Sequence, residues 1–467
     1  MKQLKATMQL NILVFVVLNL SSLLLLLFIP IVHAKTIMLL VFALTGWGMK
    51  ILPQPIISLL IMVYIPILGL GTFNDSLKGF SQSFVWLLIS TFLLAAGVEI
   101  TGVGKRIALW LLLKAQGKSS LSILYVLFTL VLLGFMIPTA SGRSAMIIPI
   151  CIGMIQVMKG TSLYLNFSKN LMLSIAFTSS FMSWGVITGS SSSIYAISFL
   201  ESTVNYKWTY FSWLQFNFPL MIISLFSLWL MFRVLFPLPT GTISEGFVYI
   251  QKEFEVLGRM TANEWKICII GLLTVIGWCT ESLHGYSVSM IALFAAIVTC
   301  IPIIGVQSWK EGSQKIDWDI VILFGAGFAM ADAIVHHQTA DWFAYKIVSV
   351  FPSVSPFLAA TIMLFITIIV RLGFANMLAI TAVFLPITIS IAGLWNINPV
   401  WLSQIVIIGC SFGYFLPIQS PSNLLSFSQG FFTEKEMMKS GLILTLIMFF
   451  FTLVVCLVVW PLMGISP

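Results

Sequence analysis

The sequence predicts an all-α polytopic membrane protein, an inverted repeat with two re-entrant hairpins, two broken helices and roughly eleven transmembrane helices at about 20 residues each. Three observations predict this class. Of its 467 residues, 59% are hydrophobic and 8% are charged, whereas soluble domains carry about 25% charged residues. Apolar runs recur along the whole chain. Their interruptions follow the same order in both halves, as in a duplicated fold.

The net positive charge of the chain does not predict a nucleic-acid partner. The net charge is +8, but the Lys and Arg residues sit mainly in short loops, where they mark the cytoplasmic side of a membrane protein. The cysteines are scattered and lack metal-ligand spacing, so we expect small core residues and neither a disulfide framework nor a metal site. These cysteines are Cys151, Cys268, Cys279, Cys300, Cys410 and Cys456.

The N-terminal stretch can be interpreted in two ways. Lys2, Lys5, a long apolar run and the small-residue sequence Val32-His33-Ala34 imitate a signal peptide. The run over residues 12–31 is longer than a usual signal core, which favours an uncleaved first helix. We therefore expect a multi-pass protein of the cytoplasmic (inner) cell membrane, with its N-terminus in the cytoplasm.

The chain divides into two membrane halves joined by a polar segment. We expect a first half over residues 1–236, a cytoplasmic linker over 237–266 and a second half over 267–467. Short apolar pieces around charged tips predict hairpins at about 84–113 and about 319–350. The alternative for the first is one ordinary helix followed by an amphipathic loop.

Two apolar segments are broken at a depth where lipid would surround them. In Thr139–Ile150, Gly142 and Arg143 interrupt the run directly after Pro138. A charge at the bilayer centre costs roughly 2.5–3.5 kcal/mol on insertion scales, and broken backbone is tolerated there only when it is buried or lines a cavity. The second segment, 371–387, also combines Arg, Gly, Asn and Thr. Two interrupted segments in matching places of two halves indicate a transporter site.

A third and a fourth break are rich in hydroxyl groups. Gly189 precedes four serines, Ser190 to Ser193, and the second half has the sequence Ser420-Pro421-Ser422-Asn423. Such groups suit an ion or a polar substrate. The alternative is a close contact between helices.

Matched features in the two halves support the duplication. They are Gly46-Trp47 with Gly277-Trp278, Trp86 with Trp318, Phe92–Glu99 with Phe324–Asp332, Pro149-Ile150 with Pro386-Ile387, and Ser180-Phe181 with Ser411-Phe412. Each match is weak alone. Together they coincide with every break.

Arg143 and Arg371 are the residues most costly to place in lipid. Either can bind an anion, since guanidinium forms bidentate bonds to planar anions. Either can instead pair with an acid such as Glu99 or Asp332, or with backbone carbonyls at a helix end. A third interpretation is that an internal Arg replaces a bound Na⁺ and removes ion coupling.

The neutral polar residues of the breaks complete the candidate site. Asn376, Asn423 and Thr381 offer oxygens to Na⁺ or to a polar substrate, although helix capping explains the asparagines equally well. We predict substrate binding by Ser141, Gly142, Arg143, Asn376, Ser420, Pro421 and Asn423. We predict ion binding by Thr139, Ser141, Gly189, Ser190, Asn376 and Thr381. The pair His336-His337 does not predict a metal site.

At these residues the chain resembles the divalent anion/sodium symporter family of the ion transporter superfamily. The resemblance is strongest over 257–265, 278–281, 318–332 and 413–441. It implies a homodimer with inverted repeats, a region that moves like an elevator, and di- or tricarboxylate or sulfate substrates driven by Na⁺. The family's Ser-Asn-Thr triplets are altered here, to Thr139–Arg143 and to Ala375-Asn376-Met377, and only Asn376 carries over.

The sequence therefore predicts a secondary active transporter for a small anion, coupled to Na⁺ or H⁺, with no cofactor beyond a coupling Na⁺. One alternative is a cation/proton antiporter or oxyanion exporter of the same superfamily. Another is a membrane protein that kept the fold and lost transport. No catalytic arrangement appears in the sequence, so we do not expect an enzyme.

Overall fold

The computed structural model describes residues 2–49, 51–238, 243–374 and 376–467, and this part of the chain is helical without a strand. Within it, nine helices are long and apolar enough to cross a membrane, and five shorter apolar helices accompany them. The expected all-α polytopic fold is confirmed.

The first half runs from α1 to α12. Its elements are α1 (Lys2–Ser22), α2 (Leu25–Phe28), α3 (Ile31–Met49), α4 (Gln54–Ile67), α5 (Phe73–Leu77), η1 (Lys78–Ser81), α6 (Ser83–Thr101), α7 (Val103–Lys114), α8 (Ser119–Gly134), α9 (Ala140–Val157), α10 (Tyr164–Gly185), η2 (Ile187–Gly189), α11 (Ser191–Val204) and α12 (Tyr210–Leu235).

The helix α13 (Ser244–Val256) joins this half to the second. The remaining elements are α14 (Ala262–Cys279), α15 (Glu281–His284), α16 (Val288–Cys300), α17 (Trp309–Ser313), α18 (Trp318–His336), α19 (Thr339–Val350), α20 (Pro356–Leu372), α21 (Met377–Leu394), α22 (Pro399–Cys410), η3 (Pro417–Gln419), α23 (Pro421–Phe427), α24 (Glu434–Val454), η4 (Val455–Val459) and α25 (Trp460–Leu462).

Equivalent helices of the two halves begin with the same kind of capping residues. Thr72 and Asp75 form a capping box at the start of α5, and Ser308 and Glu311 form the same box at the start of α17. A second matched pair of boxes, each beginning with threonine, opens α12 and α24. In such a box two side chains satisfy backbone N–H groups that the first helical turn leaves free. The sequence therefore begins these helices at equivalent places in both halves.

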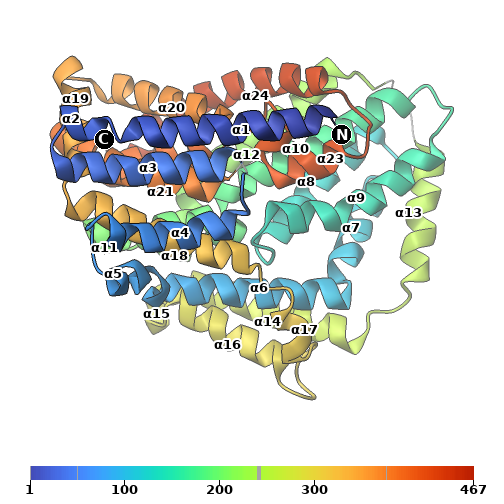
Figure 1. Ribbon diagram of the computed structural model, residues 1–467. Helices are drawn as coiled ribbons and strands as arrows, with labels where there is room; N and C mark the ends of the chain where they lie inside the picture. Colours follow the sequence, from blue (N-terminus) through green and yellow to red (C-terminus); the bar gives the residue numbers. More distant parts are fainter. Residues whose placement is uncertain (1, 50, 239–242, 375) are drawn as a thin grey trace.

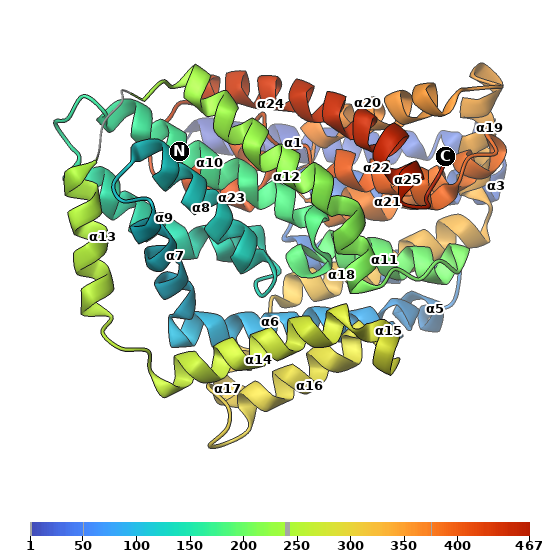
Figure 2. The same cartoon turned by 180° about the vertical axis from the view of Figure 1, so that it is seen from behind.

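The halves interlock by exchanging contacts. Helix α4 packs on α18, and its counterpart α16 packs on α6. Likewise α11 contacts α21, and α23 contacts α9. In Figures 1 and 2, α6, α14 and α16 lie together along one edge of the molecule, away from α1, α20 and α24. Helices of each half therefore pack against helices of the other half.

Corresponding helices follow the same order in the two halves. In the described residues α3, α4, α6, α8, α9, α10–α11 and α12 of the first half correspond to α14, α16, α18, α20, α21, α22–α23 and α24 of the second. An odd number of crossings per repeat would turn the second copy upside down. α1 stands outside the repeat.

The segments expected to be hairpins form helix pairs with longer first arms than expected. Helices α6 and α18 have 19 residues each, and α7 and α19 have 12 each. The left-handed residues Gly102 and Gln338 make the turns between them. The helical run of α6 continues through Glu99 to Thr101, which is why the apolar count underestimated it. The breaks that face the interior lie elsewhere, between α8 and α9, α10 and α11, α20 and α21, and α22 and α23.

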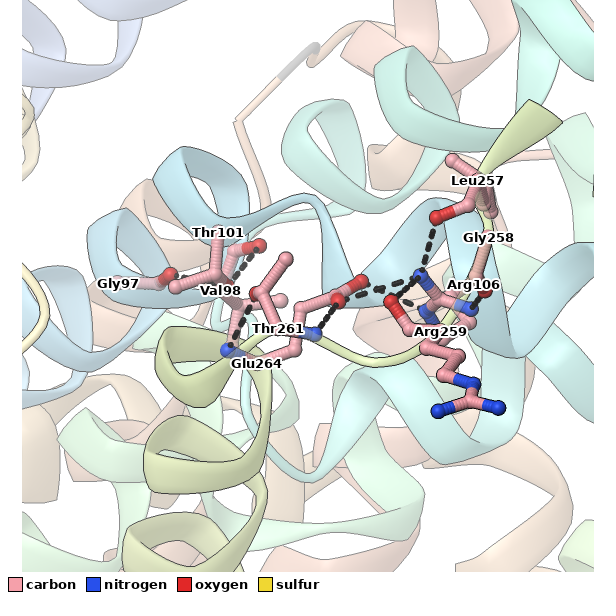
Figure 3. A network of polar contacts seen from close by, with 9 residues as sticks. All are labelled: Gly97, Val98, Thr101, Arg106, Leu257, Gly258, Arg259, Thr261 and Glu264. Atoms are coloured by element: carbon pink, nitrogen blue, oxygen red, sulfur yellow. Dashed lines mark hydrogen bonds and ion pairs between the residues drawn. The ribbon is translucent and has the colours of Figure 1, made fainter.

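A buried polar network ties the linker to the first half (Figure 3). Arg106 of α7 donates to Glu264 of α14, with N–O distances of 2.7 and 3.2 Å, and to the carbonyls of Leu257 and Gly258. The side chain of Arg259 points away from this network. Helix α13 packs on α7 and α9 along one side of the molecule. Residues 239–242 of the expected linker lie outside the described part, and the domain boundaries stay predictions.

Candidate anion site between the two halves

A cavity of about 360 Å³ lies where the breaks of both halves meet. Eleven of its lining residues carry a serine or threonine hydroxyl or a side-chain amide, and they come from the breaks and from neighbouring helices. Its lining residues are Gln54, Pro138, Thr139, Ala140, Ser141, Ser180, Ser183, Ser190, Ser191, Ser192, Asp317, Asp319, Ile320, Arg371, Asn376, Met377, Leu378, Ser411, Ile418, Ser420, Pro421 and Leu424.

Among the helices that begin at this cavity, α9 and α11 of the first half match α21 and α23 of the second. Its wall includes the first residues of α9, α11, α21 and α23. The first N–H groups of a helix lack intrahelical acceptors and carry the positive end of the helix dipole. Helix N-termini are therefore natural anion sites. Four of them around one space create a strongly anion-attracting environment before any charged side chain is considered.

Pairs of hydroxyls stand at the starts of α11 and α23. Ser190 and Ser192 lie 2.7 Å apart between their Oγ atoms, and Ser420 and Ser422 lie 2.8 Å apart. Ser190 Oγ also contacts the carbonyl of Ser183 at 2.7 Å. The two pairs occupy the same position of each repeat, directly after a 3₁₀ turn. Ser190, Ser192 and Ser420 of these pairs line the cavity.

Thr139 and Asn376 hold equivalent positions at the other two helix starts. Thr139 Oγ1 accepts from the N–H of Gly142 at 3.1 Å. Asn376 Oδ1 accepts from the N–H of Leu378 at 2.9 Å, and its amide donates to Gln54 at 2.9 Å. Capping is thus confirmed as a role of Asn376, and Thr139 caps α9 in the same way. Both side chains also line the cavity, so capping places them at the site.

Arg371 brings a full positive charge to the cavity wall. It lies in the last turn of α20 and donates to the carbonyls of Phe374 and Gln419, the latter at 2.5 Å. The Gln419 side chain returns a bond to the Arg371 carbonyl at 3.2 Å. The buried Nε atom of Arg371, like that of Arg143, has no hydrogen-bond partner in the described structure. Backbone carbonyls therefore hold the Arg371 guanidinium at the edge of the cavity.

Arg143 lies behind the wall instead of in it. It is fully buried and donates to the carbonyls of Ile137, Ser179 and Gly189 at 2.7, 3.0 and 2.8 Å. The neighbours Ser180 and Ser190 of two of these acceptors line the cavity. The bonds match the alternative in which Arg143 satisfies backbone carbonyls at helix ends. Substrate contact by Arg143 stays a prediction that this geometry does not favour.

The other predicted residues support the wall. Asn423 is buried and donates to the carbonyls of Gly413 and Leu416. Thr381 donates to the carbonyl of Met377 within α21. Gly142 lines an adjoining hollow of about 340 Å³, and Gly189 gives its carbonyl to Arg143. The structure thus brings Thr139, Ser141, Ser190, Asn376, Ser420 and Pro421 together at the cavity and leaves the rest behind it. Ala375 lies outside the described residues.

Several cavity residues escaped the sequence-based prediction. Ser180 and Ser411 were visible only as markers of the repeat, although their matched positions could have indicated the site. Gln54 comes from the first residue of α4, and Asp317 and Asp319 come from the exposed start of α18. Nothing in the sequence near these three predicts that they approach the breaks.

Comparison with known proteins agrees with this architecture. The family model described as the sodium:sulfate symporter transmembrane region matches residues 4–466. The chain belongs to this family. It is a multi-pass membrane protein of a transporter family and not an enzyme.

Two similar proteins and one solved structure align with nearly the whole chain. A protein called "Uncharacterized transporter" of Haemophilus influenzae is 28% identical over 91% of this chain and 90% of its own length. The "Sodium-dependent dicarboxylate transporter SdcS" of Staphylococcus saprophyticus is 26% identical over 90% of this chain and 85% of its own. Among solved structures, MtrF of Neisseria gonorrhoeae aligns over 94% of this chain and 96% of its own, with a TM-score of 0.57 and 12% identity. That last likeness concerns the fold alone.

Proposed function

We propose that this protein is a secondary active transporter that carries small anions, a di- or tricarboxylate or an inorganic oxyanion, across the cytoplasmic membrane. The observation that carries the proposal is the meeting of four helix N-termini from both halves at one hydroxyl-lined cavity. Such a site favours negative charge. Dicarboxylate and sulfate appear in the descriptions of its relatives and its family, and both are anions of suitable size.

The source of the lining residues supports an elevator-type mechanism. Apart from Gln54 and the start of α18, the cavity is formed by α8–α11, α20–α23 and their breaks. These segments contact one another through α10, α9 and α23. A substrate bound there would travel with the body that holds it. The expected homodimer and the cytoplasmic N-terminus belong to this proposal as well.

Coupling to Na⁺ is the expectation drawn from the relatives' names. The neutral oxygens of Thr139, Ser190 and Asn376 at the breaks are of the type that binds Na⁺ in transporters. An antiporter for a cation is the competing function. The helix N-termini and Arg371 at the cavity favour an anion over a cation as the transported substrate.

Uptake into proteoliposomes tests the proposal. Purified protein would be assayed with labelled succinate, citrate and sulfate, each with and without an inward Na⁺ gradient. We expect saturable uptake of at least one of these anions. Absence of uptake for all three under every gradient would overturn the proposed function.

Cysteine protection tests the location of the site. In a variant whose native cysteines are replaced by alanine, Ser420→Cys would be labelled with a negatively charged methanethiosulfonate reagent. We expect the transported anion to slow labelling, because it occupies the cavity. Ser428→Cys is the matched control, since Ser428 is exposed and does not line the cavity. Equal protection of both cysteines, or of neither, would contradict this location.

A further inference from the structure

The wall of the cavity carries side-chain charges of both signs. Arg371 brings one positive charge, and Asp317 and Asp319 at the start of α18 bring two negative charges. None of the three belongs to any of the six ion pairs in the described part of the chain. Backbone carbonyls hold Arg371 instead, and its side chain is 97% buried with an Nε atom that has no hydrogen-bond partner among the described residues. Opposite charges therefore line one cavity without neutralising each other by direct contact.

The basic residue that lies next to these acids in the sequence has a different partner. Lys315 pairs with Glu99 through Nζ and Oε1 at 2.5 Å, and both residues line the adjoining hollow. Asp317 lines this hollow as well as the cavity. Asp317 thus stands at the border between the two spaces, where a substrate in the cavity can reach its carboxylate.

Helix capping explains the two acids only in part. Asp317 Oδ1 accepts from the N–H of Ile320 at 3.2 Å, and Asp319 lies in the first turn, where an acid complements the helix dipole. The corresponding helix of the first half is α6. In its described stretch, α6 begins after Gln82 with neither a side-chain cap nor an acid in the first turn. The repeat therefore forms this helix without acids, and the carboxylates of α18 are an addition of the half that supplies Arg371.

Carboxylates at an anion site discriminate between kinds of anion. They repel a substrate that carries negative charge alone, whereas they attract an ammonium group on the same substrate. The helix N-termini and Arg371 attract the acid groups of either substrate. The wall is therefore complementary to a molecule that carries charges of both signs.

We propose that the preferred substrate is an amino dicarboxylate, a small molecule with two carboxylates and one ammonium group. The inference rests on the proposed function and names the substrate class of the same site. The carboxylates bind at the helix starts of the two halves and near Arg371, and the ammonium group binds at Asp317 and Asp319. A dicarboxylate without the ammonium group enters the same cavity but gains nothing from the two acids, so it is the weaker substrate.

Three dicarboxylates with the same four-carbon chain test the substrate class. Succinate, malate and aspartate differ in carrying a hydrogen, a hydroxyl or an ammonium group at one carbon. Uptake of labelled aspartate and of labelled succinate into proteoliposomes would be measured, with each unlabelled acid as competitor. We expect aspartate to bind about fivefold more tightly than succinate, because its ammonium group gains an ion pair at the rim of the cavity. Malate should resemble succinate, since a hydroxyl adds no positive charge.

Asp317→Asn tests the carboxylate directly. Asparagine retains an oxygen that can cap α18 but removes the negative charge. We expect the affinity for aspartate to fall about fivefold and the affinity for succinate to rise about twofold. Changes of opposite sign for two substrates cannot arise from a general loss of folded protein. Asp341→Asn is the matched control, because Asp341 lies exposed in the first turn of α19 and is not among the cavity residues of the described chain.

Asp319→Asn supplies a second variant that leaves the cap of α18 in place. We expect the same two changes as in Asp317→Asn, so the test survives if Asp317→Asn does not fold. The shift in melting temperature that each acid produces gives a readout of binding that does not depend on transport. Aspartate should raise the melting temperature of the unaltered protein more than succinate does at equal concentration.

The outcomes separate this inference from the function beneath it. Uptake of succinate or sulfate by a protein that binds aspartate no more tightly than succinate would overturn the amino dicarboxylate and leave anion transport standing. Equal changes in both affinities in the folded variants would do the same. A Na⁺ requirement for succinate that disappears in Asp317→Asn would assign the acids to a coupling cation instead. Absence of uptake for succinate, citrate, sulfate and aspartate under every gradient would overturn both proposals.

Discussion

The two halves of the cavity agree in their helix starts and differ in their charges. Thr139 and Asn376 cap equivalent helices. The hydroxyl pairs Ser190–Ser192 and Ser420–Ser422 have the same composition and nearly equal Oγ–Oγ distances. Arg143, however, lies behind the wall in the first half, whereas Arg371 reaches the cavity in the second.

This difference separates two tasks that one residue type can perform. Arg143 holds three carbonyls of the broken backbone and stabilises the break. Arg371 holds two carbonyls and also presents charge to the cavity. Substitution of Arg143 should therefore lower stability most, whereas substitution of Arg371 should also weaken anion binding. The following predictions use that contrast, from the largest expected effect to the smallest.

Replacing Arg143 with methionine should mainly destabilise the fold. The apolar side chain leaves buried carbonyl oxygens without donors, at a cost of about 1–3 kcal/mol for each unsatisfied group. We expect a clear fall in the melting temperature of the purified protein. Arg259→Met is the control, and equal melting temperatures for the two variants would contradict the supporting role of Arg143.

Replacing Arg371 with glutamine should mainly impair transport. The variant keeps a donor for the Gln419 carbonyl but removes the charge beside the anion, for which we expect a loss of about 2–3 kcal/mol, or about a hundredfold in apparent affinity. Concentration dependence of sulfate or succinate uptake would measure it. Unchanged affinity at an unchanged melting temperature would remove Arg371 from the site.

The hydroxyl pairs test the symmetry of the cavity. Ser190→Ala and Ser420→Ala each remove one neutral donor, so we expect a similar loss of about 1 kcal/mol, or about fivefold in affinity, for both. Ser428→Ala serves as the exposed control. A loss confined to one of the two variants would show that the anion binds asymmetrically.

The carboxyl groups of Asp317 and Asp319 line the cavity and should make transport weakly dependent on pH. Desolvation raises the pKa of Asp317, and the neighbouring Asp319 raises it further. As the pH falls through this pKa, the carboxyl group becomes neutral and repels an anion less. Apparent affinity for sulfate, whose own charge is constant over this range, should therefore improve by about twofold to fivefold on acidification.

Asp317→Asn should flatten this pH profile, whereas Asp341→Asn, an exposed control on α19, should leave it in place. A profile that is unchanged in Asp317→Asn would assign the pH dependence to another group.

How far the sequence predicts this molecule depends on how local each feature is. Composition and apolar runs predicted an all-α membrane fold, because spanning the bilayer requires long apolar helices. Thr139, Ser190, Asn376 and Ser420 could be predicted for the cavity because Pro, Gly and polar residues interrupt their helices locally. Gln54 and Asp317 could not, since tertiary packing brings α4 and α18 to the breaks.

The arginines show the same limit. The sequence established that each needs partners, because a charge is costly in lipid. It could not decide between an anion and backbone carbonyls. Only the arrangement of Ser179, Gly189 and Gln419 in space shows that carbonyls bind both guanidiniums and that Arg371 alone also faces the cavity.

The most direct test of the account is a cryo-electron microscopy map of the protein with bound sulfate or succinate. We predict density for the anion between the Ser190–Ser192 and Ser420–Ser422 hydroxyl pairs, within hydrogen-bond distance of the first residues of α9 and α21. Anion density elsewhere in the molecule, with this cavity empty in a transport-competent preparation, would contradict the central claim.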